Sequence, residues 1–102
     1  MSSDGETTQL SALTAVEVPS HVVFRAFAVE TIMLNLQTGT YHGLNPSAGR
    51  MLEALQERAV IAEAAAAVAA DYDEDRESIE ADLLTLCSGL IERGLLAVKS
   101  GA

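Results

Sequence analysis

The stretch that decides the fold runs from Glu30 to Arg50 and reads ETIMLNLQTGTYHGLNPSAGR. Its first third is apolar with a period of two, which is typical of a β-strand. Gly39 follows where a short hairpin loop needs a positive φ, a conformation that glycine adopts at little cost. Asn45 then supplies an N-cap candidate with Pro46 as the first helical residue, and Ser47 is a competing cap. The stretch therefore predicts a β-hairpin that leads directly into a helix.

Outward from this stretch, strand-like patterns dominate before Asn45 and helical patterns after it. We expect strands over residues 22–27, 31–36 and 40–44, helices over 46–57, 60–71 and 75–93, and a short closing segment at 95–98 that forms a strand or packs on the core. In the second strand, the alternation puts Ile32, Leu34 and Leu36 on one face. This order predicts an α+β domain of winged helix-turn-helix type, a three-stranded antiparallel sheet followed by three helices.

The N-terminal residues 1–15 are rich in Ser, Thr and acidic residues without a period, which predicts a disordered tail. The folded domain is then expected over residues 16–102. With 102 residues in total, the chain has length for one core only.

The chain is strongly acidic, because 15 Asp and Glu residues outnumber six Lys and Arg residues for a formal net charge of −9. A protein that binds phosphates needs clustered Lys and Arg, and here they are scattered singly. The charge therefore argues against nucleic acid and against an anionic membrane surface as partners. No apolar run approaches the ~18 residues that a bilayer requires, and the start of the chain lacks the pattern of a signal peptide. The lone Cys87 permits no internal disulfide, so a cytoplasmic protein is predicted.

Catalytic chemistry has little support in the sequence. His21 and His42 are the only histidines, and no Cys/His cluster has the spacing of metal ligands. Cys87 lies within an apolar helical stripe, where a cysteine is usually a small core residue. We find no glycine loop that would cradle a phosphate. The sequence predicts no catalytic residue, no metal site, no cofactor and no enzyme activity.

The third predicted helix carries more apolar surface than one core stripe requires. One line runs through Ile79, Leu83, Leu86 and Leu90, and a second through Leu84, Cys87 and Ile91. Two interpretations stay open: the helix is buried on two sides, or part of its surface lines a groove beside the third strand. The acidic run from Asp71 to Asp82 is better explained by solvated residues that complement the helix dipole than by a patch that attracts a basic partner.

The third strand, Thr40 to Leu44, carries no charge and no proline that would blunt a sheet edge. At an edge it is available for strand addition, in which a guest peptide pairs with the main chain and places side chains in pockets.

The run from Glu30 to Leu55 resembles PqqD-like proteins, the leader-peptide recognition domains of ribosomally made, modified peptides. The family shape is an apolar strand, a turn ending in Thr-Gly, an aromatic-containing strand, then Leu-Asn and a helix; the resemblance extends over about residues 20–98. It implies that a precursor's leader adds as a further strand beside the third strand and against the third helix. Implied backbone partners are Thr40, Tyr41, His42 and Gly43, and implied pocket residues are Leu83, Leu86, Cys87 and Leu90.

The resemblance implies a non-catalytic module that presents a precursor leader to a leader peptidase, a cyclase or another modifying enzyme. The segment from Thr38 to Asn45 is most similar to the lasso-peptide subgroup. An alternative is the peptide carrier of pyrroloquinoline quinone biosynthesis, which serves a radical-SAM enzyme. A winged-helix transcription regulator is a further alternative, although the third helix is net acidic. The last alternative is a dimerisation domain that pairs its sheet edge with a second copy of itself.

Overall fold

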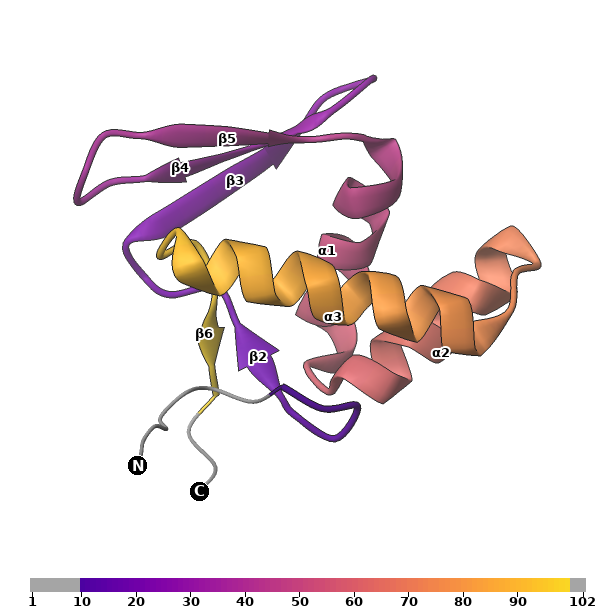
Figure 1. The fold of residues 1–102 in the computed structure, drawn as a ribbon. Helices are drawn as coiled ribbons and strands as arrows, with labels where there is room; N and C mark the ends of the chain where they lie inside the picture. Colours follow the sequence, from indigo (N-terminus) through magenta and orange to yellow (C-terminus); the bar gives the residue numbers. More distant parts are fainter. Residues whose placement is uncertain (1–9, 100–102) are drawn as a thin grey trace, which may run out of the picture.

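The computed structural model describes residues 10–99 and confirms the predicted fold class, a three-stranded antiparallel sheet followed by three helices (Figure 1). The elements in chain order are β2 (Val16–Glu17), β3 (Val22–Ala26), β4 (Thr31–Asn35), β5 (Tyr41–Leu44), α1 (Pro46–Arg58), α2 (Ile61–Tyr72), α3 (Arg76–Glu92) and β6 (Ala97–Val98).

Strand β4 lies at the centre of the sheet, antiparallel to β3 on one side and to β5 on the other. Its Thr31, Met33 and Asn35 are buried against the helices, with Met33 fully enclosed. The alternating residues Ile32 and Leu34 therefore face away from the helices and remain partly exposed. The predicted alternation is present, but the apolar line that it marks lies on the outer face of the sheet.

Local chemistry sets the helix ends that the sequence predicts. The Ala48 N–H donates to Oδ1 of Asn45 at 2.8 Å, and Pro46 is the first residue of α1. The Ser78 N–H donates to Oδ2 of Asp75 at 3.1 Å at the start of α3. After α3, Gly94 adopts a φ of 74°, which turns the chain away.

Helix α2 has no side-chain cap, since its preceding residue is Val60. The amides of Ile61 and Ala62 donate instead to the carbonyl oxygens of Thr14 and Ala12, at 3.0 and 2.8 Å. Residues 10–15, which the sequence prediction placed in a tail, thus form a turn and satisfy the free amides at this helix end. The part of the predicted tail before Leu10 lies outside the described residues.

The predicted closing strand is present as β6, which pairs with β2 rather than with the three-stranded sheet. Val16 lies opposite Val98 in this pair, so the two ends of the described chain are joined.

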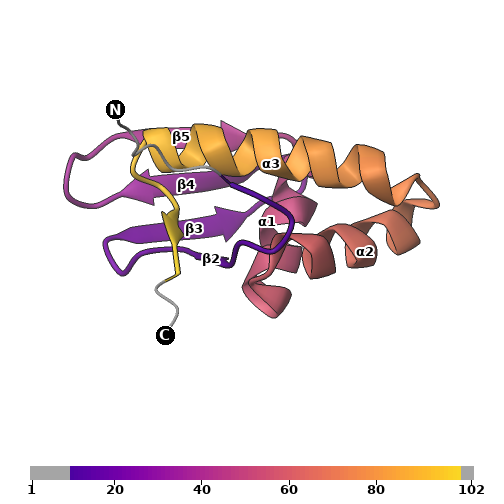
Figure 2. The ribbon, with the colours of Figure 1, turned by 60° about the horizontal axis from the view of Figure 1, so that its bottom comes forward.

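Helix α3 lies across the face of the sheet that carries the core. Figure 1 shows its C-terminal half beneath the strands, and Figure 2, which looks onto the sheet, shows it passing over β5. The small residues of α2 allow that helix to pack closely on α3; they are Ala64, Ala65 and Ala69, all buried. Within residues 10–99, no helix is long and apolar enough to cross a membrane.

Candidate functional site

The outer edge of β5 carries main-chain groups without a strand partner among the described residues. The Asn35 N–H donates to the Thr40 carbonyl oxygen at 2.9 Å, which makes these two residues a hydrogen-bonded pair. Hydrogen-bonded pairs alternate along an antiparallel ladder, so the next one joins Met33 and His42. The N–H and C=O groups of Tyr41 and Gly43 therefore point outward.

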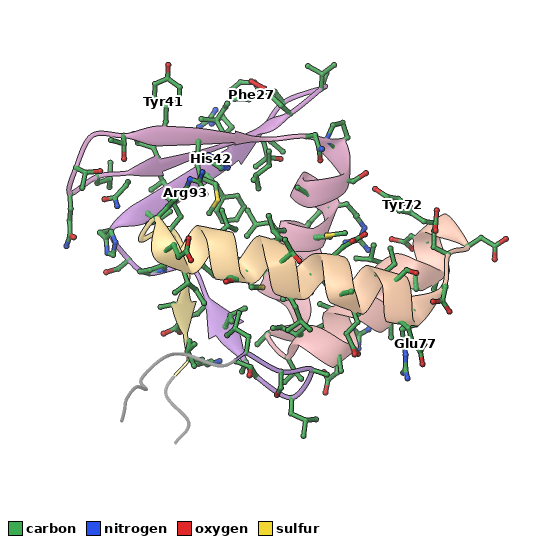
Figure 3. All side chains as sticks on the ribbon, in the orientation of Figure 1. Phe27, Tyr41, His42, Tyr72, Glu77 and Arg93 are labelled. Carbon is green, nitrogen blue, oxygen red and sulfur yellow. The ribbon has the colours of Figure 1, made fainter. Side chains whose placement is uncertain are left out.

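Two of the four predicted backbone partners thus present main-chain groups to a guest, and two do not. The Thr40 N–H contacts Oγ1 of Thr38 at 3.2 Å, and its carbonyl is occupied by Asn35. The His42 main chain belongs to the ladder with β4. Its side chain lies on the inner face of the sheet, toward α3, whereas Tyr41 points away from that helix and is 75% exposed (Figure 3).

A hollow of about 220 Å³ lies between β5 and the C-terminal end of α3. It is lined by Thr40, Tyr41, His42, Arg93 and Leu95. Figure 3 shows His42 and Arg93 side by side at this place. The structure therefore brings the third strand and the end of the third helix together around one concave surface.

The four predicted pocket residues of α3 do not line this hollow. Leu83 and Cys87 are 0% exposed and Leu90 is 1% exposed, so these three belong to the hydrophobic core. Leu86 is half-buried on one flank of that stripe, packed against the core. A direct contact of these four residues with a peptide stays a prediction, and Leu86 is the one with exposed surface.

Sequence reasoning missed Arg93 and Leu95 as lining residues. The available signal was spacing, because Arg93 follows Leu86 by two helical turns and so lies on the same flank of α3. Leu95 comes after the turn at Gly94, and no periodicity extends through such a turn.

The acidic run contributes to structure at two positions. Asp71 accepts a hydrogen bond from Nε of Arg50 at 2.8 Å and so joins α2 to α1, and Asp75 caps α3. Among residues 10–99, no group of three His, Cys, Asp or Glu side chains could hold a metal ion. Burial raises the pKa of the Cys87 thiol to about 11, so the thiol is protonated and is a poor nucleophile at neutral pH.

A family model described as coenzyme PQQ synthesis protein D (PqqD) matches residues 30–96. This chain belongs to the PqqD family. A search of curated proteins found no significant match.

Two solved structures are similar to this PqqD-family chain. One, described as TbiB1 in complex with the TbiA(beta) leader peptide, is 31% identical with a TM-score of 0.72, over 84% of this chain and 98% of that one. The other, described as lasso peptide synthetase B1 complexed with the leader peptide, is 21% identical with a TM-score of 0.71. The match covers 80% of this chain and 96% of that one. The second supports the fold alone. Proteins of this family are non-catalytic peptide-binding domains, in keeping with the sequence prediction of no enzyme activity.

Proposed function

We propose that this chain binds the leader segment of a ribosomally made precursor peptide by adding it as a further strand along β5. The observation that carries the proposal is the open edge, where the N–H and C=O groups of Tyr41 and Gly43 point outward. A structure 31% identical to this chain, described as a complex with a leader peptide, supports the same class of ligand.

A guest strand on this edge has its own alternation. Every second guest side chain lies on the inner face of the sheet, above the hollow that His42 and Arg93 line. The remaining side chains lie on the outer face beside Tyr41. The protein makes no bond in the precursor; it contributes extended geometry and a raised local concentration for an enzyme that does.

We further propose that the bound leader is presented to a leader peptidase and a cyclase of lasso-peptide biosynthesis. The similarity of residues 38–45 to that subgroup supports this assignment. The carrier of pyrroloquinoline quinone biosynthesis is the second candidate, supported by the description of the matching family. The gene neighbourhood discriminates them: a short precursor beside a peptidase gene supports the first, and a radical-SAM enzyme gene supports the second.

Hydrogen exchange measured by NMR tests the strand addition residue by residue. The probe is a synthetic peptide that spans the leader of the short precursor that the proposal expects to be encoded beside this gene. On saturation, we expect strong protection of the Tyr41 and Gly43 amides, because these two N–H groups gain acceptors. The His42 amide is already bonded within the sheet and should change little. Binding without added protection at Tyr41 and Gly43 would exclude this edge as the site.

A proline at Tyr41 tests the same edge by mutation. Proline removes the outward N–H of Tyr41, and an edge strand tolerates proline where its N–H faces solvent. We expect Tyr41→Pro to keep its fold and to bind the leader roughly tenfold more weakly by calorimetry. Tyr41→Phe, which retains the N–H, should bind nearly as well as the wild type.

A proline at His42 is the contrasting variant, because it would break the ladder with β4 and lower the stability of the sheet. If Tyr41→Pro is folded and binds with unchanged affinity, the proposed register is wrong.

Leu86→Asp tests the helix side of the site and should weaken leader binding. Leu83→Asp is unsuitable, since a carboxylate at this fully buried position would unfold the core.

A further inference from the structure

Arg93 is a cation without a carboxylate partner in the described part of the chain. The ion pairs within residues 10–99 both belong to Arg50, which contacts Glu53 and Asp71. The guanidinium of Arg93 has one polar contact there, from Nη1 to the Gly89 carbonyl oxygen at 3.5 Å. Such a long contact is weak, so the guanidinium retains most of its donors.

The lining of the hollow carries no acidic side chain, although the chain as a whole has a net charge of −9. The other residues around the hollow are Thr40, Tyr41, His42 and Leu95, and none of them is acidic. The ring of His42 adds a hydrogen-bond donor to those of Arg93, and the Thr40 hydroxyl, which shares a hydrogen bond with Oγ1 of Thr38 at 2.7 Å, can donate if it exchanges that partner. A concave surface rich in donors and free of carboxylates fits an anionic group.

Resting on the proposed function, we propose that this hollow binds a side-chain carboxylate of the leader, from an Asp or Glu residue whose side chain lies on the inner face of the added strand. Arg93 is the principal contact, and His42 and Thr40 complete the site. The substrate class is thereby narrowed to leaders that carry an acidic residue at the position opposite the C-terminal end of α3.

The carboxylate contact supplies information that strand addition lacks. Main-chain pairing is independent of sequence, so a guest strand can slip by two residues and still satisfy Tyr41 and Gly43. A guanidinium at one end of the edge fixes one guest side chain and so selects a single register. Because the rest of the protein repels acidic peptides, this local contact also favours the correct acidic residue over others.

A purely structural role for Arg93 makes a different prediction. Arg93 is the C-cap residue of α3, where a cation interacts favourably with the helix dipole, and the contact with Gly89 belongs to that role. If that were its only role, replacing Arg93 would lower the melting temperature slightly and would affect all leader peptides equally.

The test is a double-mutant cycle between Arg93→Gln and the leader of the neighbouring precursor gene. Each Asp or Glu of the synthetic leader is replaced in turn by Asn or Gln, with both peptide ends blocked. We expect one carboxylate whose removal weakens wild-type binding roughly tenfold and leaves the affinity of Arg93→Gln unchanged. Binding to the wild type should also fall more steeply with salt than binding to Arg93→Gln. Arg93→Lys should recover part of the affinity.

The matched control is Arg76→Gln, which has the same change in charge at the opposite end of α3, about 25 Å away at 1.5 Å per residue. It should bind like the wild type. A peptide with a free C-terminal carboxylate forms a separate arm, and coupling of Arg93 to that group alone would contradict the side-chain assignment. If the leader binds but no acidic residue couples to Arg93, this inference is wrong and the proposed function stands. If the leader does not bind wild-type protein, the proposed function itself fails.

Discussion

At the scale of single residues, Cys87 makes the stability of the fold depend on pH in the alkaline range. Its thiol is fully buried, and burial raises its pKa to about 11. In the unfolded chain the thiol has the pKa of a free cysteine, about 8.5. Between these values the unfolded state binds fewer protons, so the free energy of unfolding falls as pH rises, by at most about 3 kcal/mol. Urea unfolding at pH 8 and at pH 10.5 measures this loss.

Cys87→Ala is the control, because it removes the titrating group while both tyrosines remain. Its stability at pH 8 will differ from that of the wild type, so the comparison is between the two losses over the same pH interval. An equal loss in both proteins would show that the thiol does not titrate as its burial implies.

At the scale of elements, Gly49 allows α1 to approach β4 closely. A Cβ at this position would lie 2.6 Å from Oγ1 of the buried Thr31 and 3.4 Å from its Cβ. We expect Gly49→Ala to destabilise the fold by about 1–2 kcal/mol, since overpacking outweighs the gain in helix propensity. Chemical denaturation measures the change.

Thr31→Ala removes the clashing oxygen, so the cost of Gly49→Ala should disappear in that background. Gly89→Ala in α3 is a matched helix variant whose new Cβ would meet only the flexible end of Arg93, at 3.7 Å. It should stabilise the protein by up to about 1 kcal/mol. A Gly49→Ala effect that is the same with and without Thr31 would contradict the close approach.

The elements also show which structural features a sequence can predict. The cap at Asn45 and the positive φ at Gly39 follow from local chemistry, and these predictions are confirmed. The inner face of β4 could not be chosen from sequence, because apolar residues stand on both faces of the strand. The capping of α2 by the Thr14 carbonyl oxygen could not be predicted either, because the residues around Val60 do not indicate which distant main-chain carbonyl will lie there.

At the scale of the whole molecule, the fold class was predictable because the strand and helix periods are well separated along the chain. The family was predictable because residues 30–55 resemble the PqqD-like pattern. The hollow was only half predictable. Its strand side was expected because the edge strand carries no charge and no proline. Arg93 lines the same hollow as His42 only because α3 packs across the sheet. The apolar stripe of α3 likewise has no feature in the sequence that separates core residues such as Leu83 from a groove residue.

The β2–β6 pair joins the two ends of the described chain, so its packing should affect global stability. Val16 is 1% exposed opposite Val98, and its N–H donates to the Ala59 carbonyl oxygen. We expect Val16→Ala to lower the free energy of unfolding by about 1–3 kcal/mol in urea, because it leaves a cavity where the N-terminal segment, the C-terminal strand and α1 meet. Glu17→Ala, on the exposed face of the same strand, should change it by less than about 0.5 kcal/mol. Leader affinity should be the same in both variants, since this pair lies away from β5 (Figure 1). Equal stability of the two variants would show that the packing of the β2–β6 pair contributes nothing to the stability of the fold.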